Sequence, residues 1–143
     1  MAQKFNFKRL EEPFEADWPV KVNVPEDGGK TTVEEFMARF RIVRDAQPPA
    51  IADPATELTD AEQQASAEPT PTEAAAILER AHRKLREKAV EQWRAWFVGF
   101  GKPTSGEEEL TDEVLWNLIT TPYVRRAVLE AYEAFSLGIA AKN

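Results

Sequence analysis

The side chains that could carry out chemistry are few, and their spacing does not assemble a catalytic set. His82 is the only histidine, and it falls on an apolar helical stripe among arginines and lysines, with no second metal ligand at a usable spacing. Ser66, Ser105 and Ser136 lack the strand-turn-helix context of an activated nucleophile, and they would have to share that one histidine. The sequence therefore indicates no catalytic residue, and we predict that the protein is not an enzyme.

Cofactor and metal sites find no support in the sequence either. The stretch "GFGKPT" is a weak likeness of a phosphate-binding loop, because Trp96 occupies the position of its first glycine and Pro103 that of the magnesium-binding hydroxyl. The absence of cysteine removes thiolate nucleophiles and thiolate metal ligands together. Asp27, Asp112 and Glu113 have structural reasons to stand at a turn or a helix start. We expect no cofactor and no metal.

Aromatic residues are the most informative group that remains. Four tryptophans are many for so short a chain, and two of them stand close to Phe97 and Phe100. Core packing is the default explanation, yet large aromatics on a small module also form protein-binding surfaces. Because Trp93, Trp96 and Phe97 span two faces of one expected helix, at least one should be partly exposed. The candidate partner-binding residues are Trp93, Trp96, Phe97, Phe100, Tyr123, Tyr132, Phe36 and Phe40.

The elements that would position these residues begin with a β-hairpin. Apolar and polar residues alternate along "VKVNV" and again along the return strand that contains "FMARFRI", as expected of strands with one buried face. Between them, "PEDGG" supplies a proline and the two glycines Gly28 and Gly29 for a tight turn. A helix over residues 33–44 is the less favoured alternative. Two strands alone are marginal in water, so "KFNFKRL" is predicted to add a third.

The rest of the chain predicts a linker followed by helices. Residues 46–71 are rich in Pro, Ala and Glu and show no periodic apolar face. A long helix is expected from about Thr72 to Phe100, followed by two shorter ones, capped by Thr111 and by Thr121 with Pro122. The predicted fold is α+β, with a small antiparallel hairpin or three-stranded sheet, a flexible linker and about three helices. Its predicted parts are residues 1–45, 46–71 and 72–143.

Charge and hydropathy limit the classes of partner. The net charge of -7 opposes general binding to nucleic acid. The basic run "RAHRKLREK" is the best nucleic-acid likeness, but Glu79, Glu87 and Glu91 are interleaved with it, as on a solvated helix face. No stretch approaches the length of a membrane helix, and the N-terminus lacks a signal-peptide pattern. We expect a cytoplasmic protein that binds neither nucleic acid nor membranes.

Several of these stretches, taken in order, resemble the tail assembly chaperones of tailed bacteriophages and prophages. The resemblance covers residues about 18 to 43 and 91 to 137. It rests on Pro19-Val20 opening a strand, the Asp27-Gly28 turn, the "FMARF" return strand, the tryptophan element from Trp93 to Phe97, and a final helix from Val124 to Tyr132.

What the resemblance implies is a non-enzymatic role in phage tail morphogenesis in the bacterial host cytoplasm. Such proteins bind the tape measure protein, keep its long helical chain soluble and help to recruit subunits of the major tail tube protein. Self-association is left open. The alternative from another class is a small regulatory or antitoxin-like protein that uses its basic helix on DNA, whose binding would weaken steeply with salt.

Overall fold

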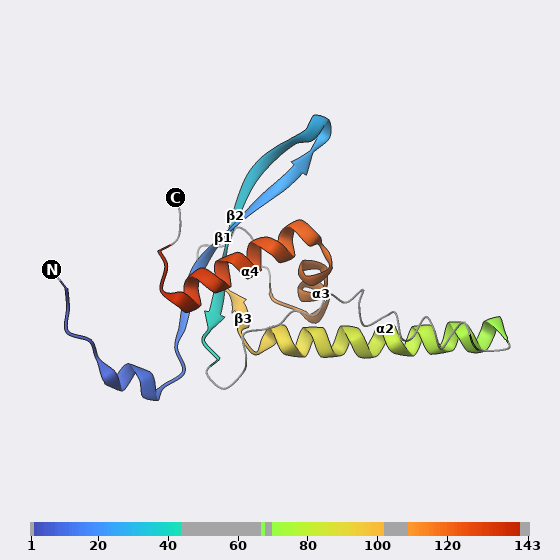
Figure 1. Cartoon of the computed structure of the whole chain (residues 1–143), viewed down its shortest axis with the longest axis horizontal. Helices are drawn as coiled ribbons and strands as arrows, with labels where there is room; N and C mark the ends of the chain where they lie inside the picture. The colour runs from blue at the N-terminus through green and yellow to red at the C-terminus, as the bar shows by residue number, and fades with distance from the viewer. Residues whose placement is uncertain (1, 44–66, 68–69, 102–108, 141–143) are drawn as a thin grey trace. The chain divides into compact units, whose positions relative to one another are not determined.

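The computed structural model describes residues 2–43, 67, 70–101 and 109–140 (Figure 1). The chain divides into two compact units: residues 1–45 with residues 94–143 form one, and residues 46–93 form the other. The elements in chain order are η1 (Phe7–Glu11), β1 (Glu15–Glu26), η2 (Asp27–Gly29), β2 (Lys30–Arg41), α2 (Pro71–Arg94), β3 (Phe97–Phe100), α3 (Asp112–Thr120) and α4 (Pro122–Leu137).

The predicted hairpin is confirmed, and the alternative helix over residues 33–44 is wrong. β1 and β2 pair antiparallel from Glu15 opposite Arg41 to Glu26 opposite Lys30. Gly28 and Gly29 adopt φ values of 81° and 78° in the turn. Residues with a Cβ rarely adopt this backbone conformation. The predicted apolar positions lie on the inner face, where Val20, Val22, Ala38 and Phe40 are buried.

The third strand comes from a different part of the chain than predicted. The sheet order is β1-β2-β3, so residues 97–100 add the third strand. "KFNFKRL" instead leads into the 3-10 helix η1, because the Asn6 side chain accepts a hydrogen bond from the N–H of Lys8 at 3.1 Å. Phe7 in this segment is 74% exposed, so the sheet does not bury it. The prediction of a strand there is wrong.

The predicted long helix is also shorter than expected. α2 ends at Arg94, and the chain then pairs with β2 through two flanking bonds: Arg41 N–H donates to the Trp96 carbonyl, and Gly101 N–H to the Met37 carbonyl, both at 2.8 Å. These bonds and the pairing of residues 97–100 with β2 give a strand where the last turn of the predicted helix was expected. At the other end, the helix begins at Pro71, since the Thr70 hydroxyl caps the N–H of Glu73.

The two shorter helices form as predicted. The Thr111 side chain accepts a hydrogen bond from Val114 N–H at the start of α3. Pro122 opens α4 after Thr121, although the Thr121 hydroxyl donates to the Asn117 carbonyl and does not cap. Gly138 ends α4 in the left-handed conformation, with φ of 70°. The predicted α+β class, with a three-stranded antiparallel sheet and three helices, is confirmed.

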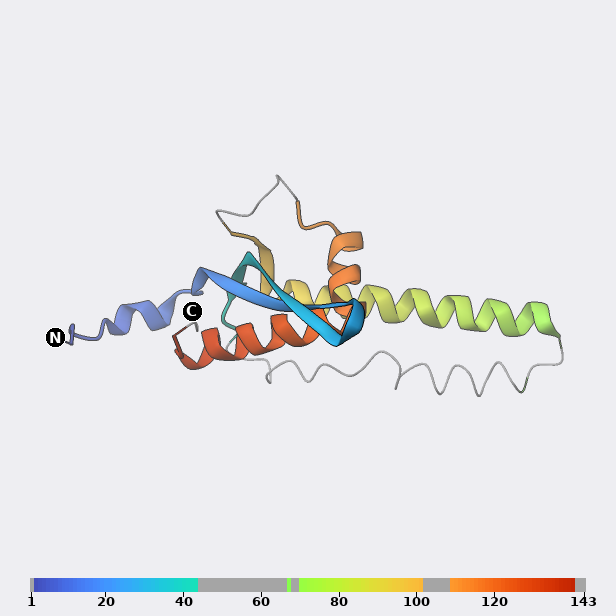
Figure 2. The ribbon, with the colours of Figure 1, turned by 90° about the horizontal axis from the view of Figure 1, so that it is seen from above.

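The division into units differs from the predicted parts. α4 packs along β1 in both views of the ribbon (Figures 1 and 2). The centroid of the Phe135 ring lies 5.5 Å from that of Trp18. The sheet and the two C-terminal helices therefore share one core, while α2 up to Trp93 belongs to the other unit. The predicted linker, residues 46–71, lies largely outside the described residues, so its flexibility stays a prediction. Across the described residues, no helix has both the length and the apolar character that spanning a membrane requires.

Candidate functional site

Most of the predicted partner-binding aromatics meet in the core of the sheet unit. Phe40 lies at the centre, on the inner face of β2. Its ring centroid is 5.9 Å from Trp96, 5.6 Å from Phe97, 5.5 Å from Tyr132 and 5.7 Å from Phe135. These tilted and edge-on contacts are the arrangements that aromatic rings favour in protein interiors. The cluster thus holds the sheet against α4.

Burial contradicts the expected exposure of these aromatics. Trp96 is 2% exposed and Phe97 0%, and Trp93, in the other unit, is 1% exposed. The expectation assumed that all three share one helix, but Phe97 belongs to a strand that turns it into the core. An interior position therefore replaces the expected surface, and these residues offer nothing to a partner in this conformation.

The remaining candidates differ in position. Phe36 and Phe100 are half-buried at the edge of the cluster, with ring centroids 5.9 Å apart. Tyr132 is 8% exposed and belongs to the core, whereas Tyr123, at the start of α4, is 40% exposed. Tyr123 alone among the eight candidates is thus a surface residue.

Tyr132 is expected to make the stability of the sheet unit depend on pH in the alkaline range. Burial raises the pKa of its hydroxyl above the ordinary value of 10.0. The folded state then holds this proton more tightly than the unfolded state, so the stabilisation is present below about pH 10 and is lost as the pH rises. We expect Tyr132→Phe to lose less unfolding free energy than the parent between about pH 8 and pH 11. Urea titrations across this range check it, with Tyr123→Phe as the exposed control; equal losses in all three proteins would contradict it.

The outer face of the sheet carries an ion-pair network. Arg41 lies 2.6 Å from the Glu15 carboxylate, and Arg39 contacts both Glu15 at 3.4 Å and Asp17 at 3.0 Å. The hydrogen bond from Arg41 is the main cause that lowers the pKa of Glu15. Because the pairs join neighbouring strands and are partly exposed, they fit a role in strand pairing, where each contributes little.

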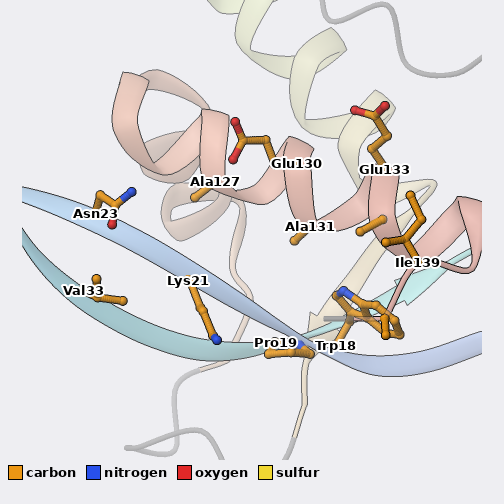
Figure 3. A pocket seen from close by; sticks show the side chains of 12 residues that line it. Trp18, Pro19, Lys21, Asn23, Val33, Ala127, Glu130, Ala131, Glu133 and Ile139 are labelled. Atoms are coloured by element: carbon orange, nitrogen blue, oxygen red, sulfur yellow. The ribbon is translucent and has the colours of Figure 1, made fainter. Parts of the chain in front are cut away.

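A groove between the hairpin and α4 is a concave feature of this unit. Its volume is about 680 Å³. One wall comes from the hairpin through Lys21, Asn23 and Val33, and the other from α4 (Figure 3). We call this feature the hairpin–α4 groove.

The lining of the hairpin–α4 groove combines small apolar and charged side chains. Ala127, Ala131 and Ala134 line it from α4, and Glu130 and Glu133 stand on the same helix (Figure 3). Trp18, Pro19 and Ile139 gather at one end of it. Small side chains leave room for a partner to approach the helix backbone closely, while the carboxylates favour cationic groups at its border.

Sequence reasoning missed this groove, although α4 carried a signal for it. Ala127, Ala131 and Ala134 are spaced by four and three residues, parallel to the stripe Val128, Tyr132 and Phe135 that enters the core. The helix thus has a large-residue face and a small-residue face side by side. A second face of alanines on a short amphipathic helix predicts a contact, and the described residues do not fill it.

Catalytic or metal-binding geometry does not emerge among the described residues. No three His, Asp or Glu side chains come together there as a metal site would require, and His82 is exposed on α2. Comparison of the chain with protein-family models, with curated proteins and with solved structures finds no match. Function must therefore be argued from the groove and from the sequence resemblance.

Proposed function

We propose that this protein is a non-enzymatic assembly chaperone that holds an amphipathic helix of its partner in the hairpin–α4 groove. The observation that carries the proposal is the groove itself, about 680 Å³ in volume and lined by a row of alanines. Recognition of a helix in a groove uses side chains at helical spacing on one element against a complementary hollow on the other.

The chemistry of the lining supports a helix as the occupant. Alanines at positions 127, 131 and 134 make a shallow, apolar track along α4, which suits the leucine-sized side chains of an apolar stripe. Glu130 and Glu133 stand beside this track, so a partner helix with Lys or Arg flanking its apolar stripe would fit best. A small-molecule site would require polar groups that converge on one point. In this groove the polar groups come from two walls and do not converge.

The identity of the partner follows from the sequence resemblance. Tail assembly chaperones hold the tape measure protein, a long helical chain with apolar patches, and help to bring subunits of the major tail tube protein to it. We infer the same role here, in the cytoplasm of the bacterial host. A mainly acidic protein with an apolar groove suits the transient holding of such a chain.

The DNA-binding alternative has less support. On the basic helix α2, Arg83 pairs with Glu79 at 3.1 Å, four residues away, as on a solvated face. This pairing reduces the positive charge that a phosphate backbone would meet.

Co-expression with the neighbouring long, coiled-coil-like reading frame, followed by pull-down, tests the proposal. We expect Ala131→Trp to fill the groove and to lower the recovered partner about tenfold or more, since hot-spot contacts lie in such desolvated pockets. Ser136→Trp is the matched control, because Ser136 is exposed on α4 and does not line the groove.

Three results would contradict this function. The partner could be recovered equally with Ala131→Trp and with Ser136→Trp, which would remove the groove from the interaction. Recovery could fail with the parent protein. Capture could also fall steeply with salt and extend to DNA fragments, as expected of the regulatory alternative. Far-UV circular dichroism of both variants shows that the fold is retained.

A further inference from the structure

The hydrogen bonds of the sheet show which way each backbone group of the hairpin points. Ile42 N–H donates to the Phe14 carbonyl at 3.0 Å, so even-numbered residues of β1 and β2 bond to each other. Arg41 N–H and the Met37 carbonyl bond to the chain around β3. Because bonding alternates along a strand, the odd-numbered residues of β2 point away from β1.

The outer edge of β1 is closed to further strands. Pro19 and Pro25 both occupy odd positions, where the missing N–H faces outward. α4 also packs along this strand. Prolines and a covering helix are two devices by which native proteins protect a sheet edge.

Over part of β2, the described residues provide neither of these devices at the opposite edge. β3 pairs only with residues 38–40. Thr31, Val33 and Glu35 direct their backbone groups to the same side, and among the described residues no strand pairs with β2 there. Residues 31–35 are exposed, and this part of the hairpin extends beyond β3 as a two-stranded ribbon (Figure 1). Such ribbons are marginal alone and gain stability from a third strand.

We propose that a second copy of this chain occupies the open edge, through antiparallel pairing of β2 with β2 about a twofold axis at Thr32. In this register Lys30 of each copy lies opposite Glu34 of the other. Both are even positions, so they form non-hydrogen-bonded pairs, whose side chains are closest. Thr31 lies opposite Val33 of the partner, and these residues supply the backbone bonds.

The charges select this register over its neighbours. With the axis at Val33, Lys30 would face Phe36, and Thr32 would face Glu34. With the axis at Glu34, the two carboxylates would oppose each other and repel. Only the axis at Thr32 sets the lysine opposite the acid twice. The shared surface is small, so the dimer should be weak and concentration-dependent.

Cysteine crosslinking tests the register, since the chain has no native cysteine. Thr32→Cys places two thiols opposite each other in a non-hydrogen-bonded pair, within the Cα separation that disulfides need. We expect mild oxidation to yield a disulfide dimer about tenfold faster than with Val33→Cys, whose thiols are out of register. The Thr32→Cys substitution removes the hydrogen bond that the Thr32 hydroxyl donates to Glu26. Circular dichroism of the reduced variant therefore checks that the fold is retained.

Charge reversal in the Thr32→Cys background provides the second arm. Lys30→Glu alone or Glu34→Lys alone sets like charges opposite each other and should slow crosslinking about tenfold. Mixing the two variants should restore it, because each cross-strand pair then joins opposite charges. Equal rates for Thr32→Cys and Val33→Cys, or a mixture that crosslinks no faster than its components, would overturn the proposal. The edge would then be left to an extended segment of another protein.

Discussion

Phe40→Ala will lower the free energy of unfolding by about 4 kcal/mol, the largest effect of any substitution proposed for this protein. The Phe40 side chain is fully buried and contacts four other rings. They belong to Trp96 just before β3, Phe97 in β3, and Tyr132 and Phe135 in α4. Removing it leaves a cavity that both the sheet and the helix border, so neither can close the space without losing its other contacts.

Chemical denaturation followed by circular dichroism measures this loss. Phe5→Ala is the matched control, because Phe5 is 61% exposed and its removal should change the stability by no more than about 0.5 kcal/mol. A cost below about 1 kcal/mol for Phe40→Ala would mean that the aromatic cluster does not hold the unit together.

Gly101→Ala is expected to cost about 2 kcal/mol, the second largest effect. A Cβ at this position would lie 2.6 Å from Cγ and 2.9 Å from Cβ of Asp17. Asp17 is itself held by Arg39 at 3.0 Å, so it cannot move away without breaking an ion pair. Gly101 N–H also bonds to the Met37 carbonyl, which fixes the backbone where the methyl group would have to fit.

Gly99→Ala is the control for this substitution. Gly99 lies two residues away on β3, and a Cβ there would meet no atom within 4 Å. Its effect should stay within about 0.5 kcal/mol. Thermal unfolding of the two variants separates close packing at Gly101 from a general intolerance of the strand to alanine. Equal destabilisation by both would contradict the close approach.

The hairpin and the two C-terminal helices could be predicted because their signals are local. The alternation around Val20 and Ala38, the glycine pair at the turn, and Thr111 and Pro122 at the helix starts each act over a few residues. No distant contact was needed to choose these elements. Their boundaries accordingly agree with the structure to within a few residues.

Residues 95–100 could not be assigned locally, because their strand depends on a distant partner. "AWFVGF" continues a helical apolar stripe in the sequence, and only pairing with β2 makes it a strand. The error then spread to the site. One helix carrying Trp93, Trp96 and Phe97 would have exposed at least one of them, whereas the turn and strand that follow α2 bury both Trp96 and Phe97. The hairpin–α4 groove was missed for the same reason: its walls come from residues about a hundred positions apart.

The wide sequence separation within the aromatic core also has a consequence for synthesis on the ribosome. β1 and β2 emerge early, but the rings that cover Phe40 lie between Trp96 and Phe135. Because synthesis proceeds at about 5–20 residues per second, the hairpin is complete roughly 5 to 20 seconds before the residues that bury its apolar face have been made. During this interval its apolar face and the outer edge of β2 are open to other nascent chains. Translation speed over residues 42–135 thus sets how long this protein, itself proposed to protect another, needs protection.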